Sequence, residues 1–246
     1  MAAIPQKYLL ANGKVAIFKR SPLGKAIDGL FAGDVSALST TLSVEKAEHK
    51  ESYTGQNSTA VSVITGTTAR IEMVAHNHSA QALARITRGT VVPQAAGTIT
   101  DEDLGTLEAG QVAFVSKINL TSATITVDGQ AAEEGEDYAL DKKTSLFTAL
   151  TAGAFKVATA EYGASDGVGL LTTGEEEYVV RFSGVNKVDG KPYVFTAYRV
   201  RFDPAQSLNF IGKEVGSYTL AGDMLLDDLK PASDVFGQFG KIETVS

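Results

Sequence analysis

VFTAYRVRFD, residues 194–203, is the stretch that decides the fold class. Its side chains alternate in character, with an apolar or small face and a face that carries Arg199, Arg201 and Asp203. Successive side chains of a strand point to opposite faces, so the pattern predicts a strand of an antiparallel sheet. One face of that sheet should be buried, and the other should be exposed to solvent or in contact with a partner. The buried face should hold Val194, Thr196, Tyr198, Val200 and Phe202.

Turn residues separate this strand from others. Asn186–Pro192 contains Asp-Gly and predicts the loop of a hairpin, and Asp128-Gly129 predicts a second one. Asn12-Gly13 predicts a third, between residues 8–10 and 15–18. Residues 69–75 repeat the alternation. Together with 24 Gly and abundant Thr, Val and Ser, these signals predict a mostly-β chain.

One short helix is expected after residue 75. Asn77 or Ser79 can cap its start, and Gly89 should end it. The side that packs on a sheet should be formed by Ala80, Leu83, Ala84 and Thr87. Residues 93–166 contain further strand signals and read as an elaboration within a single domain of residues 1–246.

Composition limits the functions that the chain can perform. The net charge is −7, from 22 Lys+Arg and 29 Asp+Glu, which argues against sequence-independent binding of nucleic acid. There is no cysteine, so disulfides and thiolate chemistry are excluded. The first ten residues do not read as a signal peptide, and no stretch reaches the roughly 20 apolar residues of a membrane helix. We therefore expect a soluble protein made in a cytoplasm, without a membrane partner.

The phosphate-binding patterns G-x-x-x-x-G-K-[ST] and G-x-G-x-x-G are absent from the sequence. His76, His78 and His49 could ligate zinc in a metal-dependent hydrolase, but surface or capping roles fit their positions better. We expect no catalytic, cofactor-binding or metal site, no cofactor, and no enzyme activity.

A dense run of charges of both signs covers Glu45 to Glu51 and passes into small and polar residues over Ser52–Thr59. It has no apolar periodicity, so it cannot bury itself on its own body. Two interpretations remain from the residues alone. It is a solvated loop, or it is an arm that becomes ordered on a partner, where mixed charges set the register.

The order of these sequence segments resembles the order found in a known protein family. Phe31–Ser39, followed by Leu42–Gln56 with its E-K-A-E-H-K-E-S-Y-T-G segment, is similar to the major tail tube proteins of long-tailed bacteriophages. The strand at 69–75 and the capped helix at 77–88 follow in the order seen in that family. Gly135–Asp141 resembles a hairpin that such proteins carry. Phe202-Asp203-Pro204 with Tyr218–Asp223 resembles their C-terminal strand pair.

The resemblance implies a fold and a function. The fold would be a tail-tube-type β-sandwich or split barrel with one short flanking α-helix and a long extended loop. Copies would form rings, hexameric in this family, that stack into the tail tube, the conduit for DNA ejection. The loop at about 45–62 would reach a neighbouring copy. The contact residues would be Glu45, Lys46, Glu48, His49, Lys50, Glu51, Tyr53, Thr54 and Gln56.

The same resemblance implies the partners and the location. The chain would bind itself, tape measure, tail terminator and baseplate or tail-tip proteins, and in contractile tails a sheath. Double-stranded DNA would pass without specific binding, because an acidic lumen repels phosphates. Glu175, Glu176 and Glu177 are candidates for that lumen, against the simpler interpretation of a solvated rim. The location would be the virion tail, after assembly in the host cytoplasm. The alternative function is a receptor- or glycan-binding β-sandwich of a virion or cell surface.

Overall fold

The computed structural model describes residues 7–245 except 54, 206, 232 and 234. Strands account for 57% of the chain and helix for 3%, which confirms the predicted mostly-β class. The chain divides into two compact units. Unit 1 contains the chain up to Thr90 and from Gly169 onward, and unit 2 contains Val91–Val168. Unit 2 thus occupies the stretch where the sequence suggested an elaboration.

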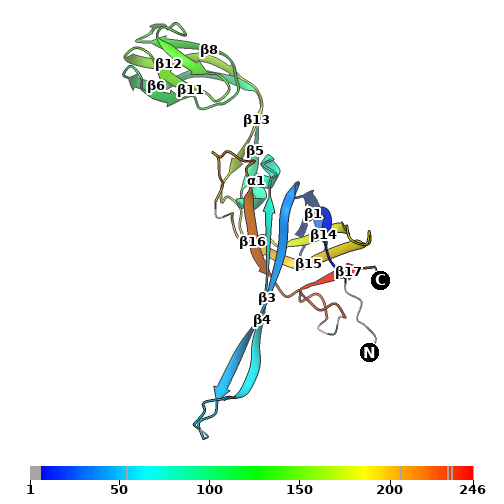
Figure 1. The fold of residues 1–246 in the computed structure, drawn as a ribbon. Coiled ribbons are helices and arrows are strands. Elements are labelled where there is room, and N and C mark those ends of the chain that lie inside the picture. Colours follow the sequence, from blue (N-terminus) through cyan, green and yellow to red (C-terminus); the bar gives the residue numbers. More distant parts are fainter. Residues whose placement is uncertain (1–6, 54, 206, 232, 234, 246) are drawn as a thin grey trace. The chain divides into compact units, whose positions relative to one another are not determined.

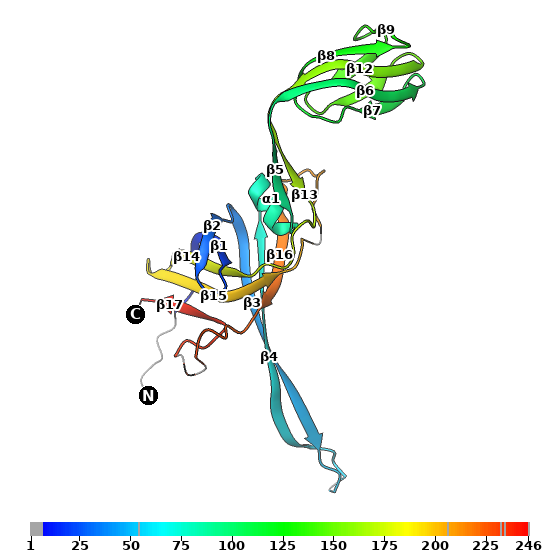
Figure 2. The same ribbon diagram turned by 180° about the vertical axis from the view of Figure 1, so that it is seen from behind.

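Unit 1 is built on an antiparallel eight-stranded sheet (Figure 1, Figure 2). Its strands are β1 (Ala11–Arg20), β2 (Ala26–Phe31), β3 (Val35–Lys50), β4 (Thr59–Ala75), β14 (Tyr178–Asn186), β15 (Pro192–Phe202), β16 (Tyr218–Met224) and β17 (Gly240–Thr244). They follow the order β2-β1-β14-β15-β16-β4-β3, and β17 pairs with the first half of β15. β1 and β3 therefore lie far apart in the order of the sheet.

The predicted alternation is confirmed in both diagnostic runs. In the 69–75 run the odd-numbered side chains are buried, whereas Arg70 and Glu72 are exposed. In β15 the predicted face is buried from Thr196 onward, and Arg199 and Arg201 are half-buried on the other face. Burial of these faces forms the core of unit 1. Its largest fully buried members are Ile71, Met73, Val180, Val200 and Leu220.

Helix α1 (Ala80–Ile86) begins where the sequence predicted. The Ser79 hydroxyl accepts a hydrogen bond from the Ala82 amide at 3.3 Å, which satisfies a helix-end donor. The end of the helix differs from the prediction. The left-handed residue is Arg88, with φ 49°, and the Gly89 amide donates to the Ala84 carbonyl. Of the predicted face, Ala84 and Thr87 are buried and Leu83 packs partly buried against the core. Ala82 and Ile86 are buried as well, so the packed face contains most of the predicted one and is wider.

Two of the three predicted hairpin turns are present, and one prediction is wrong. The loop after Asn186 joins β14 to β15, and Asp128-Gly129 is a turn with φ of 48° and 80°. Asn12-Gly13, in contrast, lies inside β1, where Gly13 is opposite Gly184 of β14. A Cβ on Gly13 would overlap the Ser183 carbonyl. Close approach of two backbones, and not a turn, therefore accounts for this glycine.

Unit 2 is a two-sheet sandwich. One sheet has the order β6 (Gly97–Leu107), β12 (Gly153–Tyr162), β8 (Leu120–Val127) and β9 (Gln130–Ala131). The other has the order β10 (Tyr138–Asp141), β11 (Leu146–Ala149) and β7 (Val112–Phe114). Phe147 lies at the centre of the core, stacked on Tyr138 at 5.5 Å and edge-on to Phe155 at 5.1 Å between ring centroids. β5 (Thr90–Gln94) pairs with β13 (Ser165–Gly169) at the two ends of this segment.

Within the described part of the chain, no helix has the length and apolar character needed to span a membrane.

We predict that Phe155→Ala lowers the free energy of unfolding of unit 2 by about 3–5 kcal/mol, because the ring is fully buried and its removal leaves a cavity. Phe114→Ala is the matched control, since Phe114 is 74% exposed in the same unit, and its effect should stay within about 0.5 kcal/mol. Urea unfolding followed by circular dichroism measures both. Equal effects of the two substitutions would contradict the assignment of this core.

Candidate functional site

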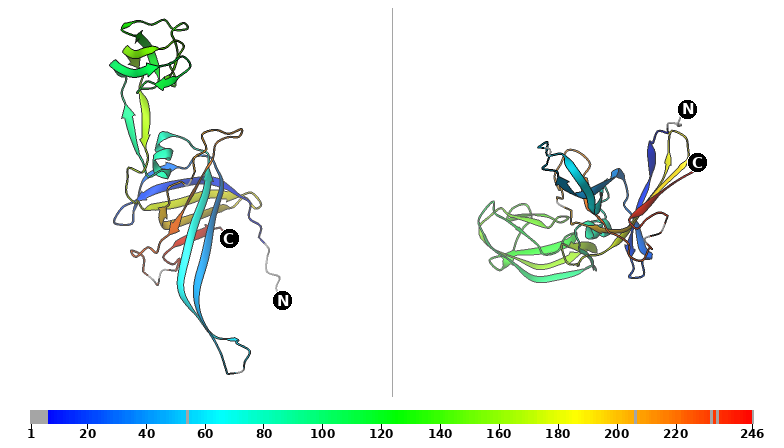
Figure 3. Two further views of the ribbon diagram at one scale, coloured as in Figure 1. Left: turned by 90° about the vertical axis from the view of Figure 1, so that its left-hand side faces the viewer. Right: turned by 90° about the horizontal axis from the view of Figure 1, so that it is seen from below.

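β3 and β4 continue beyond the sheet as a two-stranded hairpin. β16 pairs with β4 only along Ala69–Ala75, so from Thr68 outward β4 pairs with β3 alone. We call residues 43–68 the arm; it projects freely from unit 1 in Figure 1 and Figure 3. Its eight β3 residues, 43–50, extend about 27 Å at about 3.4 Å per residue. Among the described residues, both outer edges of the arm lack a strand partner.

The prediction of a loop over residues 45–62 is therefore wrong for most of that stretch. Glu45 to His49 form a ladder with Gly66 to Val61, interrupted by a bulge between Glu45 and Lys46. Only residues 51–58 connect the two strands. A strand shows alternation in its sequence when one face is buried, and the arm has no such face. The charged strand β3 consequently looks like a loop from its sequence.

The predicted contact residues lie along the arm and around its tip. Glu45, Lys46, Glu48, His49 and Lys50 are exposed on β3. Their side chains are therefore available to a partner along the whole length of the strand.

The tip contains the remaining predicted residues. Glu51 is buried; its amide donates to the Ser58 carbonyl at 2.8 Å, and its carboxylate accepts from the Tyr53 amide at 3.0 Å. Glu51 thus closes the connection between the strands. Tyr53 is 87% exposed, and Gln56 is also exposed. Thr54 lies outside the described residues.

The sequence analysis missed that the arm also presents apolar side chains. Val44, Val61, Val63 and Ile64 are each more than half exposed, and Leu42 at the base of the arm is 74% exposed. These β-branched side chains alternate with charged and polar ones on a ribbon that has two free edges. An exposed strand edge with apolar side chains is a site of pairing with another chain. The arm thus has the properties of a self-association surface.

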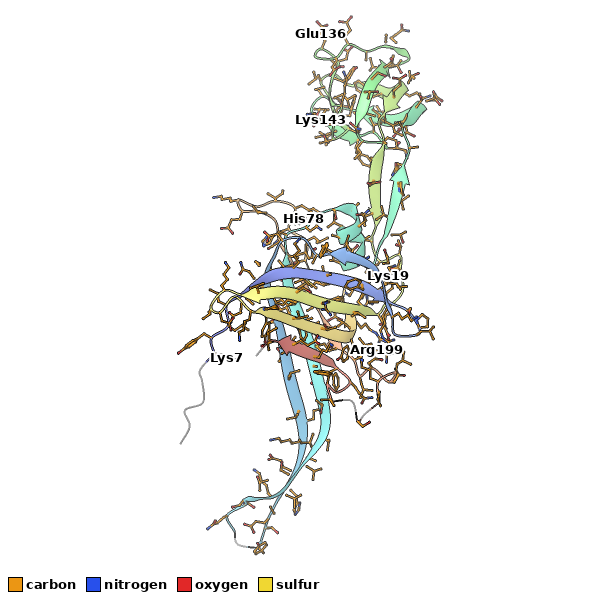
Figure 4. The ribbon with its side chains drawn as sticks, turned by 90° about the vertical axis from the view of Figure 1, so that its right-hand side faces the viewer. Lys7, Lys19, His78, Glu136, Lys143 and Arg199 are labelled. Atoms are coloured by element: carbon orange, nitrogen blue, oxygen red, sulfur yellow. The ribbon has the colours of Figure 1, made fainter. Side chains whose placement is uncertain are left out.

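A second cluster of charges fixes the body of unit 1 at the beginning of β14. The Glu177 carboxylate accepts two hydrogen bonds from Arg199, at 2.7 and 2.9 Å, and is 3.4 Å from Arg20 (Arg199 is labelled in Figure 4). Arg20 also donates to Asp227 at 2.6 Å, with both side chains 5% exposed. The Arg199 hydrogen bonds hold the pKa of Glu177 below its usual value of 4.5. Such two-point charged contacts fix the orientation of both side chains.

The two preceding carboxylates are paired as well. Burial works to raise the pKa of Glu176, but hydrogen bonds from Lys19 at 2.9 Å and from the Tyr178 hydroxyl at 2.8 Å lower it overall. Glu175 lies 3.0 Å from Arg201. These contacts leave little free negative charge on Glu176 and Glu177 for an acidic lumen, whereas the Glu175 side chain is 56% exposed, as expected of a solvated rim. The carboxylates link β14 to β1 and β15.

His76 and His78 contact backbone carbonyls and an aromatic ring. His76 Nδ1 lies 3.2 Å from the Gly216 carbonyl, and His78 Nδ1 lies 3.1 Å from the His76 carbonyl. The His78 ring meets Tyr218 edge-on. His49 lies on the arm. In the described ranges, no three His, Asp or Glu side chains gather into a group that could hold a metal ion.

The two units differ in charge. Residues 91–168 hold 12 of the 29 Asp+Glu and 4 of the 22 Lys+Arg, a net charge of −8, whereas the rest of the chain has a net charge of +1. The acidity of the chain is thus a property of unit 2. Unit 1, which carries the arm, is close to neutral.

We predict that Glu177→Gln lowers the free energy of unfolding at pH 7 by about 1.5–3 kcal/mol, the range for hydrogen bonds to charged groups. Because the pKa of Glu177 is lower in the folded state, its contribution is present above about pH 4.5 and is lost as the pH falls through the folded pKa. The difference between wild type and variant should therefore shrink at pH 3, as measured by urea unfolding. Glu175→Gln, at an exposed carboxylate, is the control. A difference that does not change with pH would contradict this role.

Comparison with known sequences places the chain in a family. A search of curated proteins found no match. A family model with the description "Protein of unknown function UCP028589" matches residues 8–243. That match covers both units, including the arm and the whole sandwich of residues 91–168. The chain therefore belongs to the family described as protein of unknown function UCP028589.

Proposed function

We propose that this chain is a structural virion protein that polymerises as stacked rings into the tail tube of a bacteriophage. Its work is mechanical: copies join through complementary surfaces and enclose a conduit for DNA. The proposal needs no cofactor and no catalytic group. It rests on the sequence resemblance described above together with the form of the arm.

The arm is the observation that carries the proposal. A hairpin with two free edges and uncovered Val61, Val63 and Ile64 is a liability in an isolated molecule. The same features are useful in an assembly, where each edge pairs with a neighbour. Lys46 and Glu48 on the same ribbon provide charges of both signs, which set the register and disfavour wrong pairings.

The charge distribution supports a role as a conduit in a different way from the acidic lumen first expected. Unit 1 has a net charge of +1, so it carries no large excess of basic residues to which phosphates would adhere. Glu176 and Glu177 are paired with cations and contribute little free negative charge. Passage of DNA without binding then follows from near-neutrality of unit 1 and not from repulsion by these carboxylates.

The alternative of a glycan- or receptor-binding module receives less support. Such a module typically recognises sugars with a cluster of exposed aromatic rings. In residues 91–168, all of which the structure describes, Phe114 is the one exposed aromatic side chain. The exposed aromatic side chains of unit 1 come from separate segments of the chain: Tyr8, Phe31, Tyr53, Phe210 and Phe236. We therefore retain self-assembly as the proposed function.

Deleting residues 48–58 should leave a folded monomer that no longer forms tubes. The deleted segment makes few contacts with the body, so the circular dichroism spectrum and the melting temperature should stay close to wild type. Negative-stain microscopy of the concentrated protein should show rings or hollow tubes for wild type only.

The control for this deletion is a triple alanine substitution of Lys187, Val188 and Asp189 in the loop between β14 and β15, which should still form tubes. Normal tubes from the deletion variant would refute the role of the arm. A wild-type protein that stays a small particle at every concentration, and binds a glycan array, would refute the proposed function itself.

A further inference from the structure

A groove of about 520 Å³ opens on unit 1 between two strands that are not sheet neighbours. One wall is the first half of β1, residues 11–15, and the other is the start of β3, residues 34–40. Its remaining lining includes Phe182, Phe195 and Ile242 from β14, β15 and β17. The two walls meet near the Ala32 amide, which donates to the Val15 carbonyl at 2.9 Å.

Both walls present unpaired strand edges. β1 pairs with β14 on one side, and on the other side β2 reaches only Ala16–Arg20, so residues 11–14 keep a free edge among the described residues. β3 pairs only with β4 in the described part of the chain. A two-stranded ribbon that entered the groove could hydrogen-bond to one wall with each of its two outer edges and cover the apolar floor. It would close the path β14-β15-β16-β4-β3-guest-β1 into a barrel.

The chain's own arm cannot be that guest. The wall of the groove and the arm are parts of one uninterrupted strand, because β3 runs from Val35 in the wall to Lys50 at the tip. The arm therefore leaves its own groove along the strand direction, as Figure 3 shows. To enter it, β3 would have to fold back and break its ladder with β4. The occupant must come from another molecule.

The arm of a second copy matches the groove in three respects. It is already extended, and the outer edge of β4 is unpaired along Thr59–Thr68. It exposes Val61, Val63 and Ile64, which suit an apolar floor. The single charged residue in the lining of the groove is Asp34, and Lys46, opposite Ile64 on the arm, has the complementary charge.

From these matches we infer that the groove between β1 and β3 is the receptor for the arm of the next copy. This inference rests on the proposed self-assembly and names its contact. The arm and the groove are different surfaces of one molecule, so the contact is head-to-tail. Head-to-tail contacts do not end at a dimer; they continue into rings or filaments.

Cysteine cross-linking tests the inference without background, because the chain has no cysteine. The double variant Val63→Cys with Ala37→Cys places one thiol on the arm and one in the groove wall. After oxidation of assembled protein, non-reducing electrophoresis should give a ladder of dimers, trimers and larger species. Each single variant should stay monomeric on the gel. Val63→Cys with Ala26→Cys is the matched control and should give no ladder, because Ala26 is exposed on β2 and pairs with Arg20, at the end of β1 opposite the groove.

Each other outcome overturns the inference. Dimers from Val63→Cys alone would mean that arms pair with arms. A ladder from Phe210→Cys with Ala37→Cys, but not from the first pair, would assign the groove to the loop that exposes Phe210 and Ile211. Tubes with no cross-link from the first pair would refute the groove while leaving the proposed function intact. Absence of any assembly by wild type would instead refute the proposed function.

A second variant keeps the test independent of disulfide geometry. Ala37→Arg places a bulky charge in the groove wall and should abolish tubes, with an unchanged circular dichroism spectrum. Ala26→Arg, at the end of β1 opposite the groove, should leave tubes normal. Normal tubes from Ala37→Arg would also overturn the inference.

Discussion

The rest of the structure depends on one constraint, which is that strand edges need partners. β14 and β15 satisfy it on both sides and lie at the centre of the sheet of unit 1. β3 does not: fifteen of its sixteen residues pair with β4, and in the described part of the chain no strand pairs with its other side. A free edge of that length, next to exposed valine and isoleucine side chains, is rarely left uncovered. The architecture is therefore complete only when something else pairs with β3 and the outer half of β4.

The body of unit 1 holds β1, one wall of the groove, in place. Arg20, Arg199 and Glu177 connect β1, β15 and the start of β14 through charged hydrogen bonds. The paired glycines Gly13 and Gly184 let β1 and β14 approach closely. Both features keep the β1 wall of the groove fixed to the centre of the sheet. A receptor wall that is already fixed loses little conformational entropy when a strand pairs with it.

The sequence predicted the parts of the fold that have one buried face. Residues 69–75 and 194–202 alternate because the sheet buries one of their sides, and Ser79 was recognisable as a helix cap. The arm was not predicted as a hairpin, because none of its faces is buried and its charges hide the strand period. The groove and the Glu177 cluster could not be predicted either. Their members are distant in sequence, as with Arg20 and Asp227, which are 207 positions apart.

Amide hydrogen exchange tests the central claim most directly. In a dilute sample of single copies, the β3 amides that point away from β4 should exchange rapidly, because nothing on their own chain covers them. In the assembled protein the same amides should become protected, together with the edge of β1 at residues 11–14. Slow exchange along β3 already in the dilute sample, unchanged on concentration, would contradict the account, since the edge would then be satisfied within one molecule.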